Sequence, residues 1–307
     1  MQQTKNVNVI QTKQMKIKKS TGERIFDVIN ICLMFVVMLV TLYPVLYVVF
    51  ASFSDSNLLI RARGLLLYPH GFSLEAYVQV FKNPMIIQGY LNTLIYVVLG
   101  VLISMVLTVL GAYALSRSRF MLSGAVMKMI VFTMYFGGGL IPFYILMRDI
   151  GVYDNLWAVV LPGAVSAMNL IIMRSAFEAV PISLEEAAII DGGGHMTILM
   201  RIILPLSLPV LSVILLYYAV AMWNSWFMPS ILIRRRELYP LQIVLREILI
   251  EKSADDMMLE TGVADRASVF ESIKYATIVV ATLPIMCVYP FLQKYFVKGA
   301  MIGAVKG

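Results

Sequence analysis

Long hydrophobic runs dominate the chain and are separated by short polar segments. A run of about 18 or more apolar residues can cross the roughly 30 Å hydrocarbon core of a bilayer as a helix. Runs of this length suit helices, which satisfy their own backbone hydrogen bonds, rather than the short alternating strands of a membrane barrel. Six spans are therefore predicted, at residues 28–53, 85–115, 129–147, 156–173, 206–233 and 275–295.

Composition supports an all-α, polytopic membrane protein. The 307 residues are 60% hydrophobic and only 14% charged, which is far from the usage of a soluble domain. We expect a basic tail at residues 1–24, a six-helix transmembrane domain at 25–296 and a short tail at 297–307. The first tail is followed by a full-length span and no small-residue cleavage site, so it is not interpreted as a signal peptide.

Lys and Arg predict the orientation in the membrane, because they are enriched in short cytoplasmic segments. With both termini inside, the inner segments carry 14 basic and 6 acidic residues, and the outer ones 11 and 12. The net charge of +7 then reflects topology and contact with anionic lipid, so no nucleic-acid partner is predicted. Three consecutive arginines at 234–236 oppose the rule, although they open a long loop, where it is weak.

Several function classes are disfavoured by what the spans lack. Apart from Lys294, next to the end of the sixth span, they contain no Asp, Glu, Lys, Arg or His, whereas ion-coupled carriers usually place such residues at mid-membrane. No Gly-Lys dipeptide occurs, so the chain has no phosphate-binding loop of the GxxxxGK type, and any ATP must be bound by another chain. The two histidines, His70 and His195, lie outside any metal-ligand spacing, and no cofactor or metal is predicted.

Mild polar side chains within the spans are candidates for a solute path. Any one of them is more readily explained by hydrogen bonding between helices. Together they suit a polyhydroxylated solute, and an indole face beside an amide, at Trp223 and Asn224, is a typical sugar-binding combination. Glycines at 137–139 with Pro142, and prolines in the last two spans, predict bends or new helix starts. The four candidate path residues are Asn92, Asn169, Trp223 and Asn224.

The polar decapeptide EEAAIIDGGG, residues 185–194, falls in the predicted cytoplasmic connection between spans four and five. Pro181 ends the preceding helix, and Ser183 with Glu186 forms an S-x-x-E capping box that predicts a short helix from Leu184 to about Ile190. The glycines end it, and a second helix returns to the membrane at Leu204 and Pro205. The first helix is expected to present a narrow face of Leu184, Ala187, Ala188 and Asp191 beside exposed Glu185 and Glu186.

Small alanines allow a partner to approach closely, and carboxylates pair with partner arginines. An ordinary acidic amphipathic loop is the alternative interpretation. The segment, however, resembles the loop signature of membrane subunits of ABC importers, E-A-A-x-x-x-G followed by nine residues and I-x-L-P. Glu186-Ala187-Ala188, Gly192 and Ile202-Ile203-Leu204-Pro205 match it in register. The commoner Asp-Gly-Ala is Asp-Gly-Gly here, and Gly193 is expected to loosen the turn.

Other segments extend the resemblance over nearly the whole chain. LNTLIYVVLGVLISMVLTVLGAYALSRSRF and WNSWFMPSIL are similar to carbohydrate-type permeases, including the smaller permease of maltose uptake. The segment from Gly137 to Phe177 and the ending QKYFVKGAMIGAVKG are similar to the branch that imports pectin or alginate fragments. The resemblance implies the six-helix type I importer fold, with the coupling loop at 181–203 between spans four and five.

The resemblance also implies the assembly and the roles of the loop residues. A second, homologous permease, two copies of an ABC ATPase that binds ATP and Mg²⁺, and an extracytoplasmic sugar-binding lipoprotein would complete an oligosaccharide importer of the bacterial cytoplasmic membrane. The chain itself would have no catalytic activity. Glu186 would pair with an ATPase arginine, Ala187 and Ala188 would pack, and Gly192 would turn. Alternatives are an ABC permease for a non-sugar solute and, in a different class, an ion-coupled carrier or channel.

Overall fold

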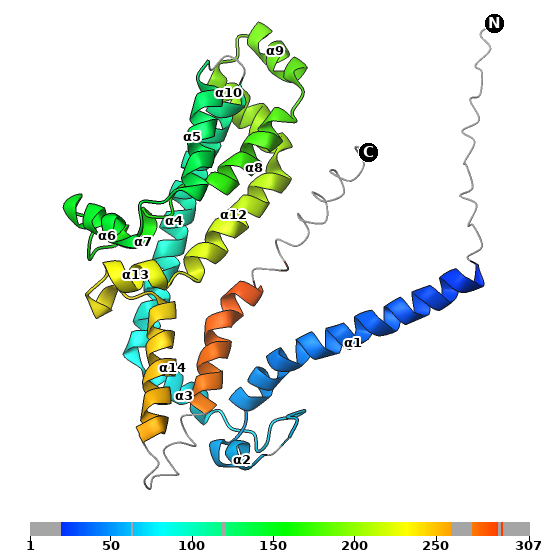
Figure 1. Ribbon diagram of the computed structural model, residues 1–307, viewed down its shortest axis with the longest axis vertical. Helices are drawn as coiled ribbons and strands as arrows, with labels where there is room; N and C mark the ends of the chain where they lie inside the picture. Colours follow the sequence, from blue (N-terminus) through cyan, green and yellow to red (C-terminus); the bar gives the residue numbers. More distant parts are fainter. Residues whose placement is uncertain (1–19, 63, 118–120, 259–271, 288–289, 291–307) are drawn as a thin grey trace, which may run out of the picture. The chain divides into compact units, whose positions relative to one another are not determined.

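The computed structural model describes residues 20–62, 64–117, 121–258, 272–287 and 290, and the described part is helical, apart from one isolated bridge between Ser54 and Phe72. The chain divides into two units, residues 1–47 and 48–307 (Figure 1). The first contains most of α1 (Thr21–Ser52), a 32-residue helix whose apolar side chains are exposed around most of its circumference. A helix that is hydrophobic on all sides is suited to lipid.

The second unit is built around α4, with shorter helices along its sides (Figure 1). The described residues also form a π-helix at Leu199–Ile203 (η1), a 3₁₀ turn at Arg236–Leu238 (η2) and a helix at Ser272–Cys287. The labelled α-helices of this unit are α2 (Ser56–Arg61), α3 (Glu75–Lys82), α4 (Pro84–Ser116), α5 (Ser123–Tyr135), α6 (Leu140–Asp149), α7 (Trp157–Val160), α8 (Ala167–Glu178), α9 (Ile182–Ile190), α10 (His195–Ile198), α11 (Leu204–Leu206), α12 (Leu208–Trp223), α13 (Phe227–Leu232) and α14 (Leu241–Met258).

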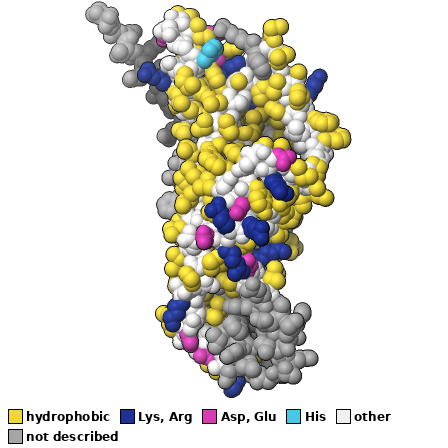
Figure 2. Space-filling view, turned by 90° about the vertical axis from the view of Figure 1, so that its left-hand side faces the viewer, with side chains coloured by type: hydrophobic (Ala, Val, Ile, Leu, Met, Phe, Trp, Pro, Cys, Tyr) yellow, Lys and Arg dark blue, Asp and Glu magenta, His cyan; other side chains and the backbone are white. Residues whose placement is uncertain are grey.

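Most buried residues of α4 are small or polar, while many of its large apolar residues are exposed; Ile86, Tyr96 and Leu115 are buried exceptions. This arrangement is typical of helices in lipid, where close approach and interhelical hydrogen bonds hold helices together. A Cβ added at Gly100 would lie 2.8 Å from Met222 of α12, and the Thr108 hydroxyl is 2.7 Å from that of Tyr218. Figure 2 shows hydrophobic side chains over most of one face of the molecule.

Three buried clusters follow α4 along its length. The first joins α3, the start of α4, α14 and the helix Ser272–Cys287; the second joins the end of α4 with α8, α10, η1 and α12; the third lies among α6, α7 and α13. The clusters tie α14 to the N-terminal half of α4 and the α9–α10 region to its C-terminal end. About 40 Å of helix separates Tyr90 from Arg117, at 1.5 Å per residue.

Several predicted spans differ from the observed helices. Residues 129–147 are not one helix, because α5 and α6 meet at 116° across Phe136–Gly139, where the glycines predicted a break and Gly139 has φ 87°. The segment 156–173 is interrupted between α7 and α8, and 206–233 between α12 and α13. The chain also bends by 86° at Ser207. Each interruption lies beside a glycine, a proline or a polar residue that favours turns.

Two of the described helices, α1 and α4, are long and apolar enough to cross a membrane alone, and up to five spans result if each bent pair is counted as one. Only part of the predicted sixth span lies in the described helix Ser272–Cys287, and residues 288–289 and 291–295 lie outside the described residues. The tails at 1–19 and 297–307 lie outside them as well.

Candidate functional site

The decapeptide forms α9, but its first turn is not held by the predicted capping box. The N-cap is Pro181, which has φ −57° and ψ 128° and makes no side-chain cap hydrogen bond, and its carbonyl accepts from the Leu184 N–H (3.2 Å). Ser183 and Glu186 therefore lie inside the helix, and the prediction of a capping box is wrong. The proline ring fixes φ near the value that the N-cap has here, so Pro181 starts the helix without a side-chain cap, and the helix begins one residue before Ser183.

The glycines end α9 in a Schellman motif, in which two backbone N–H groups beyond the helix bond back to its last turn. The Gly192 N–H donates to the Ile189 carbonyl (3.0 Å) and the Gly193 N–H to the Ala188 carbonyl (2.8 Å). Gly192 has φ +81°, which favours glycine. A Cβ at Gly193 would lie 2.7 Å from the Ala188 oxygen, so this residue allows a close approach and does not loosen the turn as expected.

The two glutamates of α9 have opposite environments. Glu185 is only 8% exposed and forms an ion pair with Arg117, the residue that ends α4. Arg117 also donates to the Phe177 carbonyl (3.3 Å) and lies over the Tyr113 ring, 5.1 Å from its centroid. The expectation that Glu185 is exposed is wrong, because the C-terminal end of α4 brings Arg117 against the inner face of α9, where it pairs with Glu185. Glu185 fixes α9 to α4 and α8.

Glu186 points away from this contact and is exposed, as are Ala187, Asp191 and Gly192, whereas Ala188 is half-buried against the α4–α8–α12 cluster. Within the described part of the chain, neither a hydrogen bond nor an ion pair is recorded for the Glu186 side chain. The exposed face of α9 thus offers the Glu186 carboxylate beside the small Ala187 side chain, with Asp191 as a second exposed carboxylate at the end of the helix.

A cavity of about 560 Å³ lies between α9, the ends of α4 and α8, and α10. Its wall combines the carboxylates Glu178, Glu185 and Glu186 with Arg117 and apolar side chains. Glu178 pairs with Arg174 (2.7 Å) and Glu185 pairs with Arg117. Of the three carboxylates on the wall, Glu186 is therefore the one available to a cation on a partner protein. The cavity is suited to an arginine-bearing partner surface.

The return from α9 to the membrane is a continuous but irregular helical path through α10, η1 and α11. Ile198, Leu199 and Ile203 are buried in it, which anchors the loop, while Leu204 is half-buried and Pro205 exposed. Proline removes one helix hydrogen bond, and the π-helix just before Pro205 widens the turn there.

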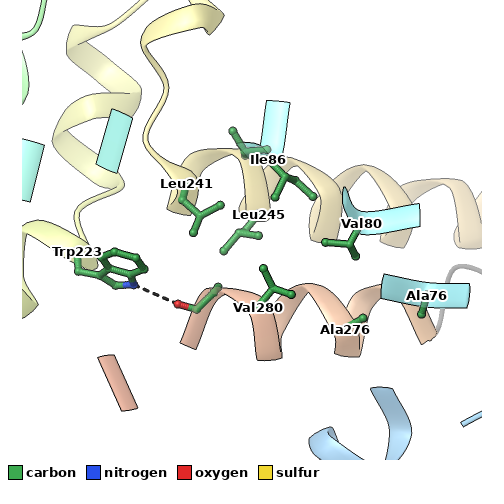
Figure 3. Close-up of a cluster of buried hydrophobic side chains, with 10 residues drawn as sticks. Ala76, Val80, Ile86, Trp223, Leu241, Leu245, Ala276 and Val280 are labelled. Carbon is green, nitrogen blue, oxygen red and sulfur yellow. Dashed lines mark hydrogen bonds between the residues drawn. The ribbon is translucent and has the colours of Figure 1, made fainter. Parts of the chain in front are cut away.

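Most of the predicted path residues have packing roles. Asn92 is buried and donates to the carbonyls of Glu237 (2.6 Å) and Tyr239 (3.1 Å). Trp223 is 5% exposed and donates to the Ala281 carbonyl (3.2 Å) within the first cluster (Figure 3). Asn169 is also buried near the start of α8. The structure therefore does not place the Trp223 indole on an open path.

Asn224 borders a second cavity, of about 450 Å³, at the break between α12 and α13. The aromatic ring on this cavity belongs to Trp226, which is 38% exposed. The predicted amide, Asn224, thus lies beside an indole, but that indole is Trp226 and not Trp223. Arg246 of α14 lies over that ring, 3.8 Å from its centroid. Sequence reasoning missed Arg246, because nothing local links α14 to residue 226.

Two of the three arginines that oppose the positive-inside rule form side-chain ion pairs with acidic residues. Arg235 donates from Nε to Asp154 Oδ2 (3.2 Å), and Arg236 pairs with Glu247 (3.1 Å). The backbone N–H groups of Arg234 and Arg235 both donate to Asp154 Oδ1 (2.9 Å each). The backbone hydrogen bond from Arg235 is the largest cause of a pKa for Asp154 below its ordinary value. The loop therefore contributes less free positive charge than its sequence indicates.

No cluster of three or more His, Cys, Asp or Glu residues suited to a metal ion occurs among the described residues. No family model matches the chain. It is 39% identical over 285 residues to the polygalacturonan/rhamnogalacturonan transport system permease protein YtcP of Bacillus subtilis (strain 168), covering 92% of this chain and 99% of that protein. It is 27% identical over 298 residues to the maltodextrin transport system permease protein MdxG of the same organism, covering 94% and 99%.

A solved structure gives an independent comparison. The crystal structure of a bacterial ABC transporter involved in the import of the acidic polysaccharide alginate matches with a TM-score of 0.82 and 34% sequence identity. The match covers 91% of this chain and 99% of that chain.

Proposed function

The chain belongs to the family of carbohydrate ABC importer permeases, and from this premise we propose that it imports an oligosaccharide as one of two permeases in an ATP-driven complex. The observation that carries the proposal is the 39% identity to an oligosaccharide-type permease over 92% of the chain. Membrane-spanning helices and the exposed E-A-A helix agree with it. No observation favours a non-sugar solute or an ion-coupled carrier.

Coupling to ATP hydrolysis is assigned to α9. An ATPase arginine pairs with the free carboxylate of Glu186, and the small Ala187 side chain allows close packing. The ion pair between Glu185 and Arg117 then transmits the movement of α9 to α4. When the ATPases close, α9 moves with them, and the permease pair changes between inward-open and outward-open forms by differential binding of two states.

The remaining parts of the complex follow from the family. A second, homologous permease forms the heterodimer, two ATPase subunits bind ATP and Mg²⁺, and an extracytoplasmic lipoprotein delivers the sugar. With α9 on the cytoplasmic side, both termini lie in the cytoplasm, in agreement with the basic residues of the first 24 positions. The chain itself has no catalytic role and binds no cofactor.

Reconstitution tests this function. The permease pair, the ATPase and the binding protein are placed in proteoliposomes, and a panel of neutral and acidic oligosaccharides is screened for ATP-dependent uptake and stimulated ATP hydrolysis. We expect at least one oligosaccharide to be taken up only when both the ATPase and the binding protein are present. Uptake by this chain without an ATPase, or a complex stimulated only by non-sugar solutes, would contradict the proposal.

A further inference from the structure

The cavity bordered by Trp226 and Arg246 combines the chemical groups that a charged sugar requires. It lies among the α12–α13 break, α14 and the helix Ser272–Cys287. Its wall carries an indole, a guanidinium, the carboxamides of Asn224 and Gln242, and threonine hydroxyls. Few directed polar groups on an otherwise apolar wall are typical of small-molecule sites. The cavity is far from α9 along α4, at the end where the solute enters if α9 is cytoplasmic.

Arg246 is the chemically decisive residue of this wall. Its guanidinium carbon lies 3.8 Å from the centroid of the Trp226 ring. The indole therefore covers one face of the guanidinium, whose N–H donors point outward in its plane and are free to bind a ligand. Arg246 is exposed, and no described carboxylate forms an ion pair with it, whereas the nearby Arg235 and Arg236 are paired with Asp154 and Glu247. A held guanidinium without an acidic partner is suited to a carboxylate ligand.

The framework around Arg246 is fixed by side chains of α4. Thr93 accepts from the Leu241 N–H (2.8 Å), Asn92 donates to the Tyr239 carbonyl (3.1 Å), and Tyr96 donates to the Leu238 carbonyl (2.7 Å). These contacts fix the start of α14, and the first buried cluster continues along it through Val244 and Leu245. Arg246 is therefore presented from a supported helix.

A hydroxyl beside the cavity lacks an internal partner. The Thr277 side chain is 1% exposed, and no hydrogen bond is recorded for its Oγ1 atom among the described residues, although Thr277 is one of the residues lining the cavity. A buried hydroxyl without a partner costs free energy unless a ligand or water satisfies it. Because Thr277 is 1% exposed, its hydroxyl does not reach the open part of the cavity, and the argument for a charged ligand rests on Arg246.

We propose that this cavity is a recognition site for the carboxylate of an acidic sugar residue, a uronate, within the transported oligosaccharide. Arg246 binds the carboxylate, Trp226 holds the guanidinium and offers its remaining surface to the sugar ring, and Asn224 and Gln242 bond hydroxyls. The inference rests on the proposed function. It agrees with the acidic polysaccharide of the solved transporter, although the charge and burial around Arg246 carry it.

Uptake by the reconstituted complex tests the site, with Arg246→Gln, Arg246→Lys and the control Lys274→Gln. Lys274 is an exposed cation on the helix Ser272–Cys287 that does not line the cavity. The substrates are trigalacturonate and a neutral oligosaccharide that the wild type imports, each at saturating loaded binding protein. We expect Arg246→Gln to lower trigalacturonate uptake about 10- to 100-fold and Arg246→Lys to lower it less. Neutral uptake and the control should match the wild type.

The other outcomes separate the two proposals. If Arg246→Gln matches the wild type, or lowers acidic and neutral uptake equally, the cavity does not recognise a carboxylate, and a partner subunit covering it becomes the better explanation. If the wild type imports only neutral sugars, the uronate site is overturned while the importer stands. If no oligosaccharide is imported at all, the proposed function fails, and the uronate site with it. Co-purification of the ATPase with each variant shows that it has folded.

Discussion

Arg117 at the end of α4 and Glu185 on α9 form an ion pair that joins the longest helix of the second unit to the short helix carrying the family signature. Their side chains are 17% and 10% exposed, so the pair is largely shielded from water. Arg117 also contacts the Phe177 carbonyl at the end of α8. One guanidinium thus connects α4, α8 and α9, and under the proposed function we expect a movement of α9 to be passed to both longer helices.

Replacing Glu185 with alanine should destabilise the protein and weaken coupling. Removing one partner of a shielded pair leaves the other charge uncompensated, at a cost of about 3 kcal/mol. We expect a lower Tm in detergent and a reduced ratio of sugar transported to ATP hydrolysed, with ATPase binding retained, because Glu185 faces inward.

A double substitution distinguishes the pair from the single residues. Arg117→Gln together with Glu185→Gln removes both charges, so the loss of stability should be clearly smaller than the sum of the two single losses. Additive losses would show that Arg117 and Glu185 do not act as a pair. Wild-type transport stoichiometry in all three variants would remove the role assigned to the pair in coupling.

Replacing Glu186 with arginine should separate binding from stability in the opposite way. Because Glu186 is exposed, the free energy of unfolding should change by no more than about 0.5 kcal/mol, and Tm should stay close to that of the wild type. Repulsion of the ATPase arginine should weaken association by about 10-fold or more. Co-purification and sugar-stimulated hydrolysis measure it, and Asp191→Asn, on the same exposed face, serves as the comparison. An undiminished complex would exclude Glu186 from docking.

Sequence reasoning located α9 and its glycine end because these depend on local chemistry: a proline, a short apolar stretch and a residue with positive φ. It also located α1 and α4, since long apolar runs leave no alternative to a helix. The partner of Glu185 was not predictable, because Arg117 lies 68 positions away and the contact depends on how α4 meets α9. For the same reason Trp223 and Trp226, near neighbours in sequence, could not be assigned to core and cavity.

Asp154 gives a prediction with a defined pH dependence. Its pKa lies below the ordinary value, mainly because of the backbone hydrogen bond from Arg235, so the folded protein favours the ionised form. That stabilisation is present above the ordinary pKa of an aspartate and is lost as pH falls through the lowered value. Asp154→Asn should therefore reduce Tm equally at pH 5 and pH 8, and by less than Glu185→Ala does.

The penalty of Asp154→Asn should shrink only in acid, as pH falls from the ordinary aspartate pKa through the lowered pKa of Asp154, where the folded wild type also becomes neutral. Thermal unfolding in detergent across this range measures the difference. A penalty that changes between pH 5 and pH 8 would indicate that another titrating group, and not Asp154 itself, controls the contact with Arg234 and Arg235.

Trp223 and Trp226 should respond to substitution in different ways, because one is packed in a core and the other borders a cavity. Trp223→Ala removes an indole that is 5% exposed and its bond to the Ala281 carbonyl, and a loss of about 3–5 kcal/mol is expected. Trp223→Phe keeps most of the packing and should lose about 1 kcal/mol, with sugar affinity unchanged.

Trp226→Ala should cost less stability than Trp223→Ala but lower oligosaccharide uptake, since Arg246 loses its support. Tm and uptake measured on the same preparations decide the matter: if Trp223→Phe weakens sugar uptake at wild-type stability, the path runs past Trp223, as the sequence alone predicted.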